Sequence, residues 1–203
     1  MSLNPLSKSL HRHELEKHLK RVLPTLSGRI LDVGSKSRRY DKLLPTRPTA
    51  IDLQPNNTLD IAPGDVQSLP FPDESFDSIV CLEVLEYIES PRKAAVELYR
   101  VLAPGGTLVV STPFLVKVHD DRMRYTDKRL AELFSTFKSA EILPIGNFYL
   151  VILDLLRGKI LDQILPLRIV LSILWLPLCI FLPFARISKD TRYTSGYLVI
   201  AKK

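Results

Sequence analysis

The chain has 203 residues, 46% of them hydrophobic and 25% charged, which is enough to bury the core of one domain of ordinary size. Its net charge of +6 lies at the front, because eleven of the 28 Lys and Arg but only four of the 22 Asp and Glu fall within residues 1–48. The two cysteines stand far apart in apolar runs, which excludes a paired-cysteine metal site and favours reduced thiols in a cytoplasmic protein.

Residues 1–27 are expected to form a basic helical segment. No uncharged apolar run precedes its charges, so no secretory signal is expected. The basic face could contact phosphates or anionic lipid headgroups, although a solvated helix face is the more common role of such a pattern. No aromatic residues alternate with the charges and no acidic or cysteine partner completes a site around His11, His13 and His18, so neither nucleic acid nor a metal ion is an expected partner.

Residues 28–150 alternate between strand and helix patterns. Short apolar runs bounded by turn residues predict buried strands at 29–33, 49–53, 76–82 and 107–111, with further strands at 140–145 and 196–201. Helical spacing covers 91–102, where Pro91 fits the first turn and Pro104-Gly105-Gly106 ends the helix, and also covers 126–137. This order predicts one α/β domain with a doubly wound, mostly parallel sheet.

Acidic residues recur where predicted strands end. Asp32 and Gly34 close the first strand, Asp52 ends the second twenty residues later, and Asp65 precedes the turn at 69–71. Ligands of doubly wound sheets bind beyond the carboxyl ends of the strands, and an acid at the second strand suits a pair of ribose hydroxyls. Each Asp alone could cap a turn, but three at successive strand ends favour a nucleoside-containing cofactor.

The segments ILDVG, AIDL, GDVQSLPF, FDSIVCLEVLEYIESP and RVLAPGGTLVVSTPF, in this order, resemble the class I S-adenosylmethionine-dependent methyltransferases of the type 11 group. The resemblance covers about residues 28–137. It implies a seven-stranded sheet whose last strand runs antiparallel between the fifth and sixth, with S-adenosylmethionine as cofactor. The implied cofactor contacts are Asp32, Gly34 and Ser35 near the methionine moiety, Asp52 and Leu53 at the ribose, Asp65 and Val66 at the adenine, and Cys81, Leu82 and Glu83 beneath the cofactor. Glu86-Tyr87 stands where the family usually has Glu-His.

The first loop departs from the family's Gly-x-Gly-x-Gly pattern, because it reads Gly34-Ser35-Lys36-Ser37-Arg38. Side chains in place of two glycines could crowd the cofactor. Alternatively, Lys36 or Arg38 could pair with the methionine carboxylate. Impaired cofactor binding would leave a methyltransferase-like scaffold that acts as a binding subunit.

The segment 111–134 resembles the H-x-x-x-D-x-x-R-x-T pattern of methyltransferases found with surface-polysaccharide and lipid-linked glycan genes, with a shorter spacing. The resemblance implies that His119, Asp121, Arg124 and Tyr125 lie over the methyl donor, with His119 as the base. The alternative is a loop histidine and an Asp-Arg pair that cap the next helix.

Residues 151–190 form an apolar insertion, and 194–203 hold the final strand. The seventeen residues 169–185 carry no charge, but as a helix they would reach only about 25 Å, against about 30 Å for a bilayer core. A single crossing would also separate the final strand from its sheet. Peripheral membrane contact through 164–186 is therefore expected, with a buried insertion or an oligomer contact as the alternative.

Together these features predict a methyltransferase (EC 2.1.1) at the cytoplasmic face of the membrane. The predicted reaction is O-methylation of a glycan or lipid-linked small-molecule acceptor. A quinone or another small lipid is the nearest alternative acceptor. A nucleotide-dependent dehydrogenase is disfavoured, because the LPF and PGG segments belong to the methyltransferase pattern.

Overall fold

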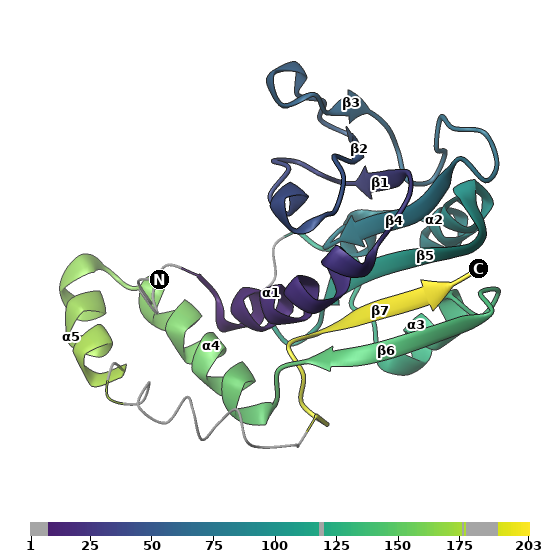
Figure 1. Cartoon of the computed structure of the whole chain (residues 1–203). Helices are drawn as coiled ribbons and strands as arrows, with labels where there is room; N and C mark the ends of the chain where they lie inside the picture. Colours follow the sequence, from purple (N-terminus) through teal and green to yellow (C-terminus); the bar gives the residue numbers. More distant parts are fainter. Residues whose placement is uncertain (1–7, 118–119, 176, 178–190) are drawn as a thin grey trace.

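A computed structural model describes residues 8–117, 120–175, 177 and 191–203, and within them the chain forms one seven-stranded sheet (Figure 1). The strands are β1 (Ile30–Val33), β2 (Thr49–Asp52), β3 (Ala62–Pro63), β4 (Phe76–Leu82), β5 (Leu102–Pro113), β6 (Ser139–Ile145) and β7 (Gly196–Lys202). Their order is β3-β2-β1-β4-β5-β7-β6, and only β7 runs antiparallel to its neighbours, β5 and β6. This confirms the predicted doubly wound sheet and the place of its last strand.

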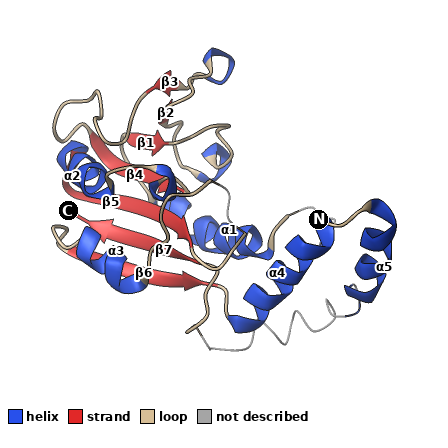
Figure 2. Ribbon diagram, turned by 180° about the vertical axis from the view of Figure 1, so that it is seen from behind, coloured by secondary structure: helices blue, strands red, loops and turns tan. Residues whose placement is uncertain are grey.

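Helices cover both faces of the sheet, as Figures 1 and 2 show from opposite sides. Helix α1 (Leu10–Val22) packs on one face, and α2 (Pro91–Val101) and α3 (Asp127–Leu133) pack on the other. Successive strand residues alternate between the two cores. Val80 and Val109 face α1, whereas Ile79 and Val110 face α2 and α3. Because both faces are covered, the central strands are mostly apolar.

The structure differs from the sequence expectation at three places. The short strand β3 carries too few residues to show an alternating pattern, so it was not predicted. Helix α2 ends at Val101, and β5 begins at once with Leu102, which pairs with Phe76 before an irregularity in the register. The Pro-Gly-Gly turn is therefore part of a long strand. Helix α3 covers only the first half of the predicted 126–137.

Two consecutive helices, α4 (Phe148–Leu161) and α5 (Leu165–Trp175), follow β6 and extend beside the sheet (Figure 1). Helix α4 contacts both α1 and α5. In the described part of the chain, no helix combines the length and the apolar character that a membrane crossing requires. Of the apolar run 169–185, residues 176 and 178–185 lie outside the described residues, and so does Cys179.

Candidate active site

Two cavities lie at the carboxyl edge of the parallel strands. The first, called here the β1–β2 cavity, has a volume of about 470 Å³ and is lined by residues that include Gly34, Asp52, Asp65, Val66, Glu83 and Tyr87. The second, called the α1–α4 cavity, has a volume of about 460 Å³ and is lined by residues that include His11, Glu83, Glu86, Tyr87, Asp121 and Arg124. Glu83 and Tyr87 line both, so the two cavities meet at the end of β4.

The loop after β1 takes the left-handed backbone conformation although it lacks two glycines. Gly34 has φ +72°, and a Cβ there would lie 2.3 Å from Val84 Cγ2. Lys36 and Arg38, which stand where the family pattern has glycines, have φ values of 46° and 49°. The loop therefore keeps the shape of a glycine-rich turn at the cost of backbone strain at two positions.

Arg38 offsets this strain through its side chain. Its guanidinium donates to the backbone carbonyls of Leu59, Pro48 and Asp60 and pairs with Asp41 at 2.8 Å. The group is almost fully buried and is committed to these four partners, so it does not reach toward a ligand in the cavity. Of the two basic side chains proposed for a carboxylate, only Lys36 lines the β1–β2 cavity.

Asp52 holds the loop against the end of β2. Its carboxylate accepts the backbone N–H of Lys36 at 3.0 Å and that of Gln54 at 2.9 Å, and it lines the cavity. The Asp65 carboxylate accepts the N–H of Gln67 at 2.8 Å, beside the buried Val66. Both carboxylates are thus fixed by backbone donors while they border the space where a ligand would lie.

The other predicted cofactor contacts divide into two groups. Leu53 is exposed and Glu83 is partly buried, and both line the β1–β2 cavity. Asp32, Ser35, Cys81 and Leu82 are not among the residues that line it. Burial raises the pKa of Asp32 to about 6, against a smaller opposing effect of the Ser35 hydroxyl. Burial likewise raises the pKa of the Cys81 thiol.

Sequence reasoning did not identify several lining residues of this cavity. Arg122 lines it and donates its backbone N–H to the Glu86 carbonyl at 2.7 Å, while its guanidinium pairs with Glu89 at 3.3 Å. Gln54, Gly64 and Gln67 also line it. Gln54 lies two residues after the end of β2, so the predicted strand boundary could have suggested it. Arg122 is brought to the cavity only by the tertiary fold.

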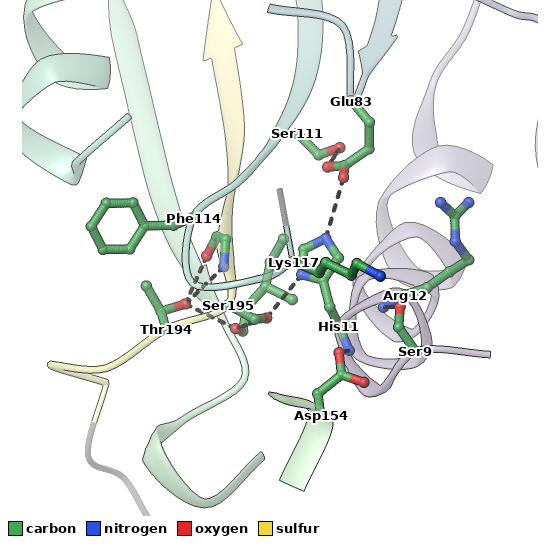
Figure 3. A network of polar contacts seen from close by, with 12 residues as sticks. Ser9, His11, Arg12, Glu83, Ser111, Phe114, Lys117, Asp154, Thr194 and Ser195 are labelled. Carbon is green, nitrogen blue, oxygen red and sulfur yellow. Dashed lines mark hydrogen bonds and ion pairs between the residues drawn. The ribbon is translucent and has the colours of Figure 1, made fainter. Parts of the chain in front are cut away.

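His11 of α1 connects the end of β4 with the start of β7 (Figure 3). Its Nε2 lies 3.3 Å from Glu83 Oε2, and its Nδ1 lies 2.8 Å from Ser195 Oγ. The other Glu83 oxygen accepts the Ser111 hydroxyl at 2.8 Å. Gly196 leaves the room for this ring, because a Cβ there would lie 2.7 Å from His11 Cε1. The histidine that sequence reasoning placed on a basic helix is therefore buried in a polar network.

Asp154 of α4 fixes the position of α1. Its two carboxylate oxygens accept the backbone N–H groups of Leu10 at 2.9 Å and His11 at 3.1 Å, and its Oδ1 also accepts Arg157 Nε at 2.8 Å. A carboxylate at a helix N-terminus satisfies free N–H donors and matches the helix dipole. The α4 helix thereby determines where His11 meets Glu83.

Glu83 and Glu86 are neighbouring acids in unlike states. Burial opposes ionisation of Glu83, but the hydrogen bond and charge of His11, together with Ser111, hold the pKa of Glu83 below its ordinary value. Glu86 is only 1% exposed, and among the described residues neither of its carboxyl oxygens has a hydrogen-bond partner. Burial, with the charge of Glu83, raises the pKa of Glu86 to about 9. At neutral pH one carboxyl is thus ionised and the other protonated.

The cluster predicted after the fifth strand is only partly assembled at the cavities. Asp121 and Arg124 line the α1–α4 cavity and form an ion pair, and Arg124 also donates to the Phe114 carbonyl at 2.7 Å. Tyr125 is buried in the core, lines neither cavity, and donates its hydroxyl to the Leu85 carbonyl at 2.9 Å. His119, the predicted base, lies outside the described residues.

Part of this chain is similar to known methyltransferases. Residues 31–110 match the family model described as "Methyltransferase domain". This match covers less than half of the chain, so it shows similarity to methyltransferase domains over residues 31–110. A demethylmenaquinone methyltransferase of Tropheryma whipplei is 33% identical over 138 residues, which are 57% of this chain and 56% of that protein. The chain spans only 22% of the length of a demethylmenaquinone methyltransferase of Renibacterium salmoninarum and 9% of that of a biotin biosynthesis bifunctional protein of Teredinibacter turnerae.

Solved structures agree with this fold. A SAM-dependent methyltransferase from Archaeoglobus fulgidus superimposes with a TM-score of 0.61 at 15% identity, covering 95% of this chain and 94% of that one. A phosphoethanolamine N-methyltransferase of Haemonchus contortus, in complex with S-adenosyl-L-methionine, has a TM-score of 0.57 at 15% identity, with 94% and 52% covered. At these identities the structures support the methyltransferase fold, and the family agrees with the predicted enzyme class and cofactor.

The residues of the β1–β2 cavity fit S-adenosylmethionine. The Asp52 carboxylate faces the cavity and retains lone pairs for ribose hydroxyls, Val66 offers an apolar surface, and Asp65 offers an acceptor for an exocyclic amine. Gly34 packs directly against the Val84 side chain, where the Cβ of any larger residue would clash. In the described part of the chain, no group of three His, Cys, Asp or Glu residues could hold a metal ion.

Proposed function

We propose that this protein transfers a methyl group from S-adenosylmethionine, bound in the β1–β2 cavity, to an acceptor bound in the α1–α4 cavity. The observation that carries the proposal is the junction of the two cavities at Glu83 and Tyr87. One cavity borders the strand-end acids that suit a nucleoside, and the other is bordered by polar and apolar side chains of α1 and α4.

Methyl transfer requires mainly positioning and the exclusion of water. When bound, S-adenosylmethionine would supply a sulfonium methyl carbon that a lone pair of the acceptor can attack in line, with the thioether sulfur as the leaving group. In this proposal Asp52 and Asp65 hold the nucleoside, and Lys36 lies on the same cavity wall as a cation for a carboxylate. Asp121 and Arg124 border the acceptor.

The proposed acceptor is a hydroxyl compound carried by a lipid, such as a lipid-linked glycan at the inner face of the membrane. The only support for a glycan as the acceptor is the sequence cluster at 111–134. A quinone is the second candidate, because the Tropheryma whipplei relative and another from Renibacterium salmoninarum bear the name demethylmenaquinone methyltransferase.

The α4–α5 pair supports a lipid-borne acceptor. The pair exposes large apolar side chains, at Tyr149, Leu155, Leu156, Ile164, Leu165, Ile169, Val170, Ile173 and Leu174, of which Leu155 lines the α1–α4 cavity. An exposed apolar patch of this kind marks a binding surface more often than a solvated one. Since α4 also lines the α1–α4 cavity, docking of this pair on a membrane would bring lipid close to the cavity.

Cofactor binding is tested by isothermal titration of S-adenosylhomocysteine into the intact chain. Asp52→Ala removes a charged hydrogen-bond acceptor, which is worth about 1.5–3 kcal/mol and predicts a loss of affinity of roughly 10- to 100-fold. Asp73→Ala is the matched control, because Asp73 is an exposed surface acid paired with Arg100 and lies outside both cavities. No binding to the unaltered chain would leave a methyltransferase-like scaffold and refute the enzyme.

Membrane docking is tested by flotation with liposomes that contain anionic lipid. Ile173→Glu together with Leu174→Glu places charges on the exposed face of α5 and is expected to leave the protein in the unbound fraction. Val96→Glu changes an equally exposed apolar residue of α2, away from this surface, and should float like the unaltered chain. Equal flotation of all three proteins would contradict docking through α4 and α5.

The acceptor is tested by mass spectrometry of lipid and glycan extracts from cells with the active protein and with Asp52→Ala. A lipid-linked glycan that is heavier by one methyl group only with the active protein supports the first candidate. A methyl shift confined to a quinone supports the second.

A further inference from the structure

Glu86 stands out among the cavity residues because it is a buried acid without a partner. It lies in the short 3-10 turn Leu85–Tyr87 that follows β4, is 1% exposed, and lines the α1–α4 cavity. Among the described residues its two carboxyl oxygens accept and donate no hydrogen bond. A buried ionised carboxyl costs free energy unless a hydrogen-bond donor or an opposite charge compensates it. A carboxyl without such a partner in a cavity wall therefore indicates that it is protonated or that it binds a ligand.

The surroundings of Glu86 carry charges of both signs. Glu83 at the end of β4 and Asp121 of the loop after β5 favour the protonated form, and Arg124 of the same loop opposes them. The other titratable or charged groups that act on it or share its cavity are Cys81, Tyr87 and Tyr125 nearby, His11 and Arg12 of α1, Lys117 of the loop after β5, and Asp154, Arg157, Lys159 and Asp162 on and after α4.

The geometry also places Glu86 near the junction with the cofactor cavity. Its neighbours Glu83 and Tyr87 line both cavities. A cation that enters the β1–β2 cavity therefore comes close to the Glu86 carboxyl, which is protonated in the free protein. Glu83 is not free for proton exchange in the same way, because His11 and Ser111 hold both of its oxygens.

We propose that Glu86 is the acid–base group of the acceptor cavity, which releases its proton when the cationic methyl donor binds next to it and then accepts the proton of an acceptor hydroxyl. The inference rests on the proposed function and deepens it. It assigns a hydroxyl-bearing acceptor, and it makes His11 and Ser111 positioning residues that keep Glu83 as a fixed neighbouring charge.

The proton balance closes over one reaction. On binding of the donor, the carboxyl O–H bond of Glu86 breaks, its proton goes to solvent, and the electron pair stays on the carboxylate. The acceptor O–H bond then breaks, its proton returns to Glu86, and its electron pair stays on the acceptor oxygen for the bond to the transferred methyl carbon. The bonding pair released by that carbon stays on the sulfur, which becomes neutral, so the protonated Glu86 of the free protein is favoured again.

The experiment measures proton release rather than turnover. S-adenosylmethionine, which carries the sulfonium charge, and S-adenosylhomocysteine, which does not, are titrated at pH 8 into the intact chain in buffers of different ionisation enthalpy. A unit charge close to a buried carboxyl is expected to release about half a proton more for the charged ligand. Protons exchanged by the ligands themselves cancel when the same difference is measured in Glu86→Gln, which keeps the shape of the neutral carboxyl.

The extra release should disappear in Glu86→Gln and persist in Glu132→Gln, a surface control on α3, and in His119→Gln. An extra release that persists in Glu86→Gln, or equal release for both ligands in the unaltered chain, overturns the inference. If the extra proton release is lost in His119→Gln but kept in Glu86→Gln, the base is His119, as the sequence resemblance implies. If neither ligand binds the unaltered chain, it is the proposed function that fails.

Discussion

The buried carboxyl of Glu86 should make the stability of this protein depend on pH in a way that one substitution removes. Glu86→Gln replaces a carboxyl that is protonated in the folded protein with a neutral amide of nearly the same shape. Since the carboxyl has no partner among the described residues, the substitution breaks no hydrogen bond that the structure records. The change in stability therefore reports the cost of keeping this acid in the fold.

The magnitude follows from the difference between folded and unfolded states. The pKa of Glu86 rises from 4.5 to about 9 on folding, so the fold favours the protonated form. Its contribution to stability is complete below pH 4.5 and falls as the pH rises toward 9, because the unfolded chain ionises and the folded one does not. At pH 7 the loss is about 3 kcal/mol, from roughly 1.4 kcal/mol for each pH unit.

Urea unfolding of the unaltered chain and of Glu86→Gln between pH 5 and pH 8 measures this effect. The variant should be the more stable protein, by a margin that grows by about 1.4 kcal/mol per pH unit. Other buried acids do not disturb the comparison. Asp32, whose pKa burial raises to about 6, contributes equally to both proteins and cancels.

A difference between the two proteins that does not change with pH would refute this reasoning, because it would mean that Glu86 ionises alike in the folded and unfolded chain. Glu132→Gln controls for the general loss of a negative charge. That side chain is 66% exposed on α3, and its substitution should shift stability by no more than about 0.5 kcal/mol at any of these pH values.

Two further predictions concern the loop after β1 and the cluster after β5. Arg38→Ala removes the guanidinium that joins the carbonyls of Leu59 and Asp60. Urea unfolding should show a free energy of unfolding lower by about 2 kcal/mol, and calorimetry should show weaker S-adenosylhomocysteine binding. If both values are unchanged, the loop holds its shape without this side chain. Tyr125→Phe removes one buried hydrogen bond to the Leu85 carbonyl, and should lower the free energy of unfolding by about 1 kcal/mol while the affinity for S-adenosylhomocysteine stays within twofold. A large loss of affinity at unchanged stability would show that Tyr125 contributes to ligand binding.

The sheet and its helices could be predicted where local pattern was strong. The runs that became β1, β4 and β7 are mostly apolar, because helices cover both faces of the central strands. The start of β5 was misplaced, because the Pro-Gly-Gly sequence signals a turn locally, whereas pairing of Leu102 with Phe76 extends the strand through it. The two residues of β3 carried no pattern to read.

The first loop shows how a local rule can be met in another way. Two missing glycines predicted either a crowded cofactor site or a cation, Lys36 or Arg38, for the methionine carboxylate. In the structure Lys36 and Arg38 take the left-handed conformation that glycines would take, and Arg38 is anchored away from the cavity by four partners. Those partners come from segments up to 22 residues away, so the loop sequence by itself could not reveal them.

The sequence by itself predicted the side of the sheet that is proposed to bind the cofactor. Asp52 ends a short strand whose apolar residues and flanking turns are local signals, and parallel strands bring their carboxyl ends to one edge of the sheet. Only the tertiary structure decided the site that is proposed for the acceptor. It joins Leu10 to Asp154 across 144 residues and His11 to Glu83 across 72, and it buries Glu86 without a partner at the junction of the two cavities. The burial of Glu86 and the charges around it depend on elements distant in the chain, so the sequence pattern near Glu86 could not predict them.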